Sequence, residues 1–281
     1  MKRTKLFCEL GPAAYAISTY KQILTRKIQN LFSKEPFASA KSAKPLAEII
    51  YKHSSHMIKR GPGIDPRLQQ NKADNIRLAC SRIDGLIVRP GESFSFWRLV
   101  GKTSKRNGFS EGRVLVNGKL TSGLGGGLCN LANTLHILFM HTPMTITELH
   151  HHSDALAPDP DGIRKPYSAG TSVNYNYLDL RFRNDTDTAV QICARCEGDT
   201  LIAELRSDKI FPVTYRITEE DHHFRKEGNG RYYRISKIYR ETIDRSTGKL
   251  LKRELKWDNR SRVMFDPKLI PSAQLRTPTD I

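Results

Sequence analysis

The chain has 281 residues, of which 38% are hydrophobic and 8% aromatic, so wholesale disorder is excluded and a packed core is possible. Its formal net charge of +17 predicts a polyanionic neighbour: nucleic acid, an anionic membrane surface or an acidic polymer of the cell envelope. No apolar stretch reaches the roughly 20 residues that span a bilayer, which argues against a transmembrane helix.

Residues 1–70 are predicted to form a basic, helical N-terminal extension. The first 20 residues place basic before apolar residues, as a signal peptide does, but Glu9, Gly11 and Pro12 interrupt the apolar run. We therefore expect a cytoplasmic protein. Basic and apolar residues interleave over residues 21–34, which predicts an amphipathic helix. Such a helix lies either on the inner face of an anionic membrane or, as the simpler alternative, against the protein body.

Residues 71–207 are predicted to form the core. Helices are expected at residues 71–86 and 127–140, where apolar residues recur at helical spacing. The Asn117-Gly118 dipeptide predicts a hairpin over residues 113–121. Short strands are expected at residues 93–97, 145–150, 172–182, 190–196 and 201–205.

Residues 208–281 alternate apolar and polar side chains, as in Tyr232 to Ile235, which is the pattern of a half-buried sheet. We expect this β-rich segment to pack on the core instead of forming a free domain. The predicted fold class is therefore α+β: a single compact domain with an antiparallel sheet, a helix after a Gly-rich loop, and the basic helical extension.

The most distinctive local sequence is Gly125-Gly126-Gly127-Leu128-Cys129-Asn130. Three glycines permit a close backbone approach that side chains would block. Cys129 falls in the first turn of the expected helix, where the helix dipole favours a thiolate, so it is a candidate nucleophile. The alternative is a structural one, in which the cysteine is a small buried apolar residue and the glycines only form a turn.

A cysteine nucleophile needs a base and donors for a developing oxyanion. His152 is the first choice as the base, because it shares one strand face with His150 in the run His150-His151-His152. His136 lies about 10 Å further along the helix than Cys129, which is too far for a direct hydrogen bond, whereas Asn133 is a neighbour on the same face. The alternative for the three histidines is a solvated strand end.

Three further candidate groups have weaker support. Glu92 in the Pro-Gly-Glu turn is either a general acid or a cap of that turn, and the structural role is favoured. Cys193 and Cys196 have CxxC spacing, but five sparse cysteines form no disulfide framework and no second pair completes a zinc knuckle. No metal and no cofactor are expected, although His150, His152 and Asp159 offer a metal set without a defining motif.

Several sequence blocks, taken in order, resemble those of the VanW family. They lie at residues 89–97, 116–120, 125–130, 152–153 and 180–184. The resemblance implies a cell-envelope setting linked to glycopeptide resistance. Two departures stand out: Asn130 follows the cysteine where the family usually has Gln, and Gly170 stands where the family has an Asp.

Two functions remain open from the sequence. The first is a cysteine-dependent enzyme of the acyl-transferase type acting on peptidoglycan, its precursors or a related glycan, with Cys129, His152 and Glu92 as catalytic residues. The second is a non-catalytic module that binds anionic envelope polymers or muropeptides through the glycine loop and a basic surface. In either case the expected binding residues are Gly125, Gly126, Gly127, Asn130, Asn133 and His150. Nothing in the chain matches a nucleic-acid recognition motif.

Overall fold

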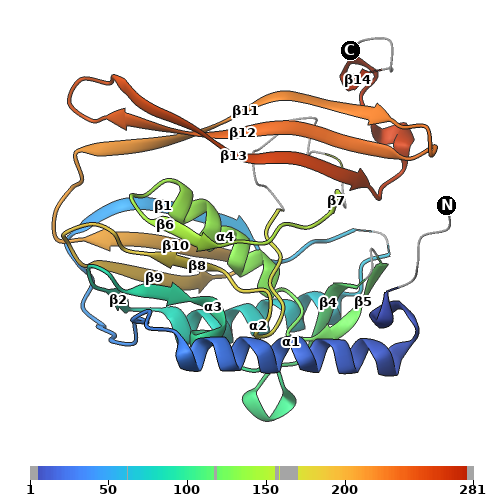
Figure 1. The fold of residues 1–281 in the computed structure, drawn as a ribbon, viewed down its shortest axis with the longest axis horizontal. Helices are drawn as coiled ribbons and strands as arrows, with labels where there is room; N and C mark the ends of the chain where they lie inside the picture. Colours follow the sequence, from blue (N-terminus) through green and yellow to red (C-terminus); the bar gives the residue numbers. More distant parts are fainter. Residues whose placement is uncertain (1–5, 62, 117–118, 156–157, 159–169, 277–281) are drawn as a thin grey trace.

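The computed structural model describes residues 6–61, 63–116, 119–155, 158 and 170–276. The body of the molecule is built on a four-stranded sheet with the order β1-β10-β9-β2 (Figure 1). Its strands are β1 (Glu48–His56), β10 (Thr200–Ser207), β9 (Val190–Glu197) and β2 (Leu86–Val88). All the neighbouring pairs in this sheet are antiparallel.

Two helices cover this sheet, α2 (Pro66–Ile83) and α4 (Leu128–Met140). The helix α2 begins at Pro66 because the Asp65 carboxylate accepts hydrogen bonds from the backbone N–H groups of Arg67 and Leu68. It therefore starts five residues earlier than the apolar spacing predicts. Almost every residue of α4 is buried, because α4 lies between the body sheet and the C-terminal sheet (Figure 1).

A small sheet with the order β3-β8-β6 completes the core. Its strands are β3 (Ser93–Ser95), β8 (Arg181–Arg183) and β6 (Thr145–Glu148), and α3 (Phe96–Val100) follows β3 directly. The buried rings of Phe94, Phe139 and Phe182 pack together here, with centroids 3.8 to 5.6 Å apart. The hairpin β4 (Glu111–Val116) and β5 (Lys119–Leu124) is confirmed, while its predicted Asn117-Gly118 turn lies outside the described residues.

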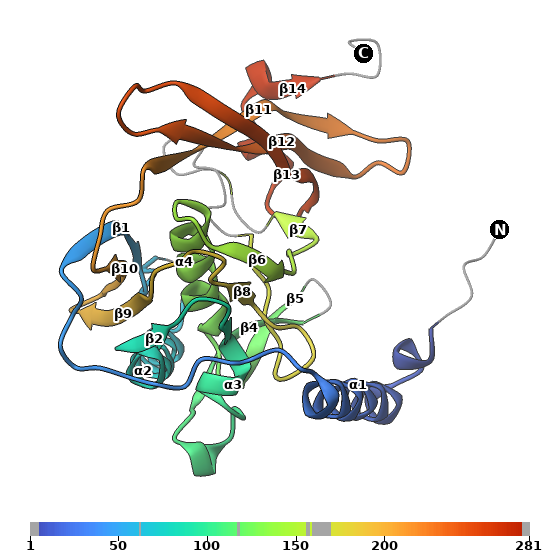
Figure 2. The same cartoon turned by 60° about the vertical axis from the view of Figure 1, so that its left-hand side comes forward.

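The C-terminal segment forms a sheet above α4 whose three long strands are antiparallel, while its two short edge strands pair in parallel (Figures 1 and 2). Its strands are β11 (Val213–Lys226), β12 (Tyr232–Asp244) and β13 (Leu250–Val263), with the short β14 (Leu275–Arg276) and β7 (Asp154–Ala155) at its two edges. Ile238 of β12 packs with Ile137 and Met140 of α4. The predicted β-rich character and the packing on the core are thus observed, whereas the domain boundaries at 70 and 207 stay predictions.

The N-terminal extension is only partly helical. The helix α1 (Pro12–Phe32) is present as expected, but residues 48–56 form β1, an edge strand paired with β10. The prediction of a helical extension over residues 1–70 is wrong for residues 48–56, because β1 gains its backbone partners from a strand about 150 residues away. Short 3-10 turns lie at Phe7–Glu9, Lys105–Asn107, Pro267–Leu269 and Ser272–Gln274.

The strand predicted at residues 172–182 is wrong for residues 172–180 and right only at its end, where β8 begins at Arg181. Residues 174–178 form a turn closed by Asn174 and Leu178, and Asn176 has a left-handed backbone with φ 54. An extended strand cannot include that conformation, so pairing begins only at Arg181. The α+β fold class with antiparallel sheets is confirmed.

Candidate functional site

The glycine loop makes its close approach to the protein itself. A Cβ on Gly126 would lie 2.2 Å from the backbone carbon of Gly112 in β4, and one on Gly127 would lie 2.4 Å from Lys72 Cγ in α2. Gly125 and Gly127 also have φ values of +77 and +102, which favour glycine. The carbonyl of Gly126 accepts a hydrogen bond from the buried Asn75 side chain at 3.0 Å. The observed contacts of the three glycines therefore pack the loop that leads into α4 against β4 and α2. This agrees with the structural alternative, in which the glycines only form a turn.

Cys129 is partly buried at the start of α4, and its thiol donates to the backbone carbonyl of Val173 at 3.7 Å. Burial raises the pKa of Cys129 above its ordinary value, and this outweighs the backbone hydrogen bonds that lower it. The expected thiolate is therefore wrong: the helix start does not compensate the cost of desolvating the charge. Among the described residues, Cys129 and His152 share no hydrogen bond, so the predicted nucleophile–base pair is not formed.

We predict that Cys129 reacts with iodoacetamide more slowly in the folded protein than in urea at the same pH. A thiol whose pKa is raised above the free value of about 8.5 carries even less thiolate at pH 7 than the few per cent of a free cysteine, and burial also limits access. Labelling rates resolved by peptide mass spectrometry test this, with Cys8 as the internal control because it lies in the turn Phe7–Glu9, where no residue is buried. Faster labelling of Cys129 in the folded state would restore the case for a nucleophile.

Among the described residues, the run His150 to His152 has partners other than the Cys129 thiol. His150 Nε2 lies 2.9 Å from Glu148 Oε1, and burial lowers the pKa of His152 while the Asp154 charge opposes that shift. Burial also lowers the pKa of His151 to about 4. The ring of His151 stacks on Trp257 of β13 with 4.0 Å between centroids. The run of histidines thus joins the body to the C-terminal sheet, and it is not the solvated strand end of the alternative.

Asn133 and His136 of α4 anchor the segment around Gly170 and Thr171. Asn133 Oδ1 accepts hydrogen bonds at 3.0 to 3.1 Å from the N–H of Gly170, the N–H of Thr171 and the Thr171 hydroxyl. His136 Nδ1 lies 2.9 Å from the same hydroxyl. A Cβ on Gly170 would lie 3.1 Å from Trp257 Cζ3. The glycine at this position leaves room for that ring. Packing against Trp257 therefore explains why Gly170 stands where the family has an Asp.

Asn130 and Glu92 also have structural partners. Asn130 Oδ1 accepts from the Ser55 hydroxyl at 2.9 Å, and its Nδ2 donates to the His56 carbonyl, so it ties α4 to β1. Glu92 Oε2 accepts from the backbone N–H of Arg89 at 2.8 Å. Glu92 thus closes its own turn, as the favoured alternative states. Neither side chain shares a hydrogen bond with Cys129 among the described residues.

The CxxC cysteines do not form a pair with each other. Residues 193 and 196 on β9 are three apart, so their side chains leave opposite faces of the strand. Cys196 instead meets Cys80 of α2, with 3.9 Å between the two sulfur atoms. All five cysteines are free thiols. Among the described residues no group of three or more His, Cys, Asp or Glu side chains has the arrangement of a metal site.

A cleft of about 520 Å³ lies between β6 of the body and the C-terminal sheet. One wall is formed by Met140 and residues 145–149, and the other by side chains of β12 and β13. The second wall carries Arg240, Lys252, Glu254 and Lys256. Residues 252, 254 and 256 alternate along β13 and so share one face. The structure therefore creates a charged cleft that the sequence analysis did not predict.

Arg240 is the least exposed charged group in this cleft, at 8% relative exposure. Its Nη2 donates to the Thr142 carbonyl, and its guanidinium lies 3.9 Å from the centre of the Tyr215 ring. Its Nε has no hydrogen-bond partner among the described residues. Burial lowers the pKa of Arg240, although a guanidinium stays charged at neutral pH. A guanidinium that lines a cleft attracts an anion strongly.

The carboxylates of the cleft are already paired. Glu254 lies 3.0 Å from Lys252 and 3.4 Å from Lys256. Glu148 binds Arg26 on α1 through two hydrogen bonds of 2.6 Å, and these bonds help to lower its pKa. The cleft therefore keeps an excess of positive charge. In the sequence, the only sign of this cleft was the alternation of apolar and basic residues on β12 and β13. The opposite wall of the cleft comes from a distant part of the chain, which the alternation does not reveal.

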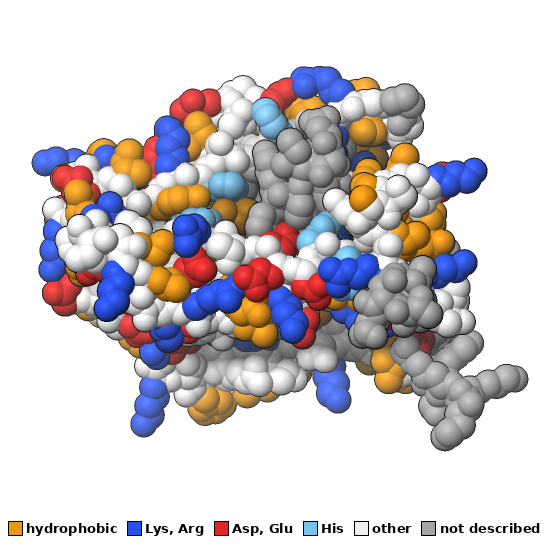
Figure 3. Space-filling view, turned by 90° about the horizontal axis from the view of Figure 1, so that it is seen from above, with side chains coloured by type: hydrophobic (Ala, Val, Ile, Leu, Met, Phe, Trp, Pro, Cys, Tyr) orange, Lys and Arg blue, Asp and Glu red, His pale blue; other side chains and the backbone are white. Residues whose placement is uncertain are grey.

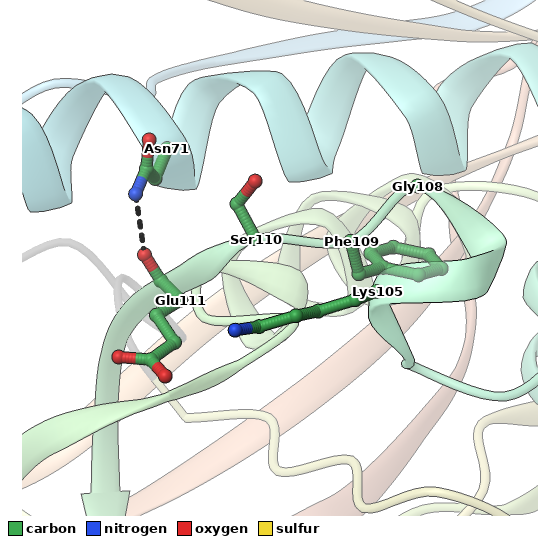
Figure 4. Close-up of a pocket in the computed structure, with 6 residues that line it drawn as sticks. All are labelled: Asn71, Lys105, Gly108, Phe109, Ser110 and Glu111. Carbon is green, nitrogen blue, oxygen red and sulfur yellow. Dashed lines mark hydrogen bonds between the residues drawn. The ribbon is translucent and has the colours of Figure 1, made fainter.

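Two other surfaces are less suited to binding. A hollow of about 450 Å³ beside α2 is open, and Figure 4 shows Asn71 bonded across it to the Glu111 carbonyl while Lys105 extends along it. On the upper face of the molecule, basic and acidic side chains are interspersed (Figure 3). Nonspecific nucleic-acid binding requires a surface that is positive throughout. This face does not provide one. No described helix has the length and apolar character to cross a membrane.

The fold and the cleft define an α+β protein with a cationic cleft between its body and a C-terminal sheet. The family model described as VanW like protein matches residues 71–206. The chain is 30% identical over 231 residues to vancomycin B-type resistance protein VanW of Enterococcus faecalis, covering 82% of each chain. The chain therefore belongs to the VanW family.

A second relative is the uncharacterized protein YoaR of Bacillus subtilis, which is 28% identical over 141 residues, half of this chain and 45% of that protein. This shorter match corresponds in length to the family region and not to the whole chain. No solved structure gives a significant match. The arrangement of the C-terminal sheet and its cleft therefore has to be interpreted from its own residues.

Proposed function

We propose that this chain is a protein of the glycopeptide-resistance setting that binds an anionic cell-wall glycan, muropeptide or precursor in the cleft between β6 and the C-terminal sheet. The resistance setting comes from the name of the Enterococcus faecalis relative. The observation that carries the binding site is Arg240, a largely buried guanidinium that lines the cleft together with Lys252 and Lys256. A carboxylate or phosphate pairs with such a guanidinium through charged hydrogen bonds.

The geometry favours binding over cysteine chemistry. Cys129 has a raised pKa and bonds to a backbone carbonyl, and the glycine loop is filled by the protein's own backbone and by Lys72. Neither feature offers the activated nucleophile that acyl transfer needs. The cleft instead combines Arg240 with Lys252 and Lys256, which lie at its exposed side. These three cations suit a ligand that carries more than one anionic group.

The proposal predicts that Lys252→Gln with Lys256→Gln weakens binding of a soluble nucleotide-linked muramoyl pentapeptide by roughly tenfold, since each exposed ion pair that is lost contributes about 0.2–1 kcal/mol. Titration calorimetry at fixed ionic strength measures the effect. Both lysines are on the protein surface, so the fold should be retained. The matched control is Lys105→Gln with Lys268→Gln, two exposed lysines outside the cleft, which should leave the affinity unchanged.

Equal affinities for all three proteins, or equal losses in the cleft and control variants, would overturn the cleft as the site. The same mixtures are then analysed by mass spectrometry, together with purified peptidoglycan and the lipid-linked precursor. A covalent product made by the wild type but absent with Cys129→Ala would establish the cysteine-dependent enzyme instead. An unchanged ligand in both samples supports the binding module.

A further inference from the structure

The helix α1 exposes a continuous apolar row. Ile17, Tyr20, Leu24, Ile28 and Leu31 follow one another at intervals of three or four residues, and each is 45% to 78% exposed. At about 100° per residue, these positions fall on one narrow face of the helix. No residue of α1 is buried. A row of five large apolar side chains in water is unusual for a helix that has a protein body to pack on.

The body holds α1 by its opposite face, through polar contacts. Arg26 forms the paired hydrogen bonds with Glu148, and it also donates to the Tyr177 carbonyl at 3.3 Å. Asn30 accepts from Arg181 at 2.8 Å. Residues 26 and 30 lie roughly opposite the row on a helix of 3.6 residues per turn. The apolar row is therefore directed away from the body by these contacts.

The charges beside the row are all positive. Lys21 and Lys27 flank it on its two sides, Lys34 follows the helix, and no Asp or Glu occurs in residues 12–34. Figures 1 and 2 place α1 along the outer margin of the molecule, on the side away from the C-terminal sheet. An extended surface of this kind can meet a flat partner along the whole helix.

We propose that α1 docks this protein on an anionic lipid bilayer, with the apolar row in the interface and the lysines at the lipid headgroups. Apolar insertion and attraction to anionic lipid are the two contributions that such a helix combines. A second copy of the chain is a poorer partner, because the lysines would face lysines and no carboxylate of α1 would offset them. The docking is independent of the cleft and of its ligand.

Vesicle flotation with the full chain tests the docking. We expect binding to vesicles of phosphatidylcholine with phosphatidylglycerol, and much weaker binding to phosphatidylcholine alone. Leu24→Gln with Ile28→Gln should lower the partition coefficient roughly tenfold or more, because two inserted aliphatic side chains are lost. Both residues are exposed, so folding is not at risk. The matched control is Leu251→Gln with Leu255→Gln, which replaces two leucines on β13 that are 53% and 50% exposed.

The electrostatic part is tested separately. Lys21→Gln with Lys27→Gln should lower partitioning and make it less sensitive to salt, because screening weakens the attraction of basic residues to anionic lipid. Partitioning that is unchanged in the Leu24 and Ile28 variant, or that falls equally in the β13 control, would overturn the proposal. So would a dimer in solution that this variant converts to a monomer while the wild type ignores vesicles, since the row would then be a self-association surface.

Discussion

Acidification from pH 7 to pH 4 should lower the free energy of unfolding by on the order of 3 kcal/mol through His136 alone. Burial lowers the pKa of His136 from 6.5 to about 3, with the His151 and His141 charges adding to the shift. The folded protein therefore keeps this ring neutral, whereas the unfolded chain takes up a proton below pH 6.5. The stabilisation is complete above pH 6.5 and is lost as the pH falls towards 3.

Urea unfolding at a series of pH values between 7.5 and 4 measures this loss. The variant His136→Asn keeps a polar atom near the Thr171 hydroxyl but cannot titrate. The slope of its unfolding free energy against pH should therefore be smaller than that of the wild type, by up to about 1.4 kcal/mol per pH unit. His141, His151 and His152 also have lowered pKa values, so some pH dependence should remain in the variant. The control is His56→Asn, at an exposed strand end. Parallel curves for wild type and His136→Asn would contradict the prediction.

The elements that the sequence predicts well are those with strong local signals. The helix α4 follows three glycines and carries apolar residues on all sides, and the β9–β10 hairpin has clear alternation about Glu197-Gly198-Asp199. The strand β1 was missed because its partner β10 is far away in the chain. The turn at 174–178 was missed because Asn176 adopts a left-handed backbone, which no periodicity reveals.

The candidate site was harder to predict than the fold. The sequence draws attention to Cys129 and His152, but their chemistry depends on burial and on the partners that tertiary packing supplies. The glycines predicted a close backbone approach correctly, while what approaches them, Gly112 and Lys72, depends on how β4 and α2 are placed. Arg240 looks like any outward-facing residue of an alternating strand. Only the docking of β12 over Thr142 makes it a buried group.

A single buried carboxylate links several of these parts, and its loss should strongly destabilise the protein. Asp179 is 1% exposed and accepts four hydrogen bonds, of which the one from Arg181 is also an ion pair. Its donors are the Ser95 hydroxyl at 2.5 Å, the N–H groups of Trp97 and Leu180 at 3.0 Å, and Arg181 Nε at 2.9 Å. Arg181 in turn contacts Glu148, the residue that holds α1.

The variant Asp179→Ala should lose about 3–5 kcal/mol of unfolding free energy, because it leaves buried donors and part of a buried charge unpaired. For a chain of this size the melting temperature should fall by roughly 10 °C. The matched control is Asp187→Ala, whose carboxylate is 79% exposed and pairs with the surface Lys209 and the exposed Thr188 hydroxyl, so its melting temperature should hardly change. Asp179→Asn should fall between the two, since the amide oxygen still accepts from backbone N–H groups but its uncharged side chain cannot neutralise Arg181. Equal melting temperatures for Asp179→Ala and the control would show that solvent or rearranged neighbours replace the carboxylate.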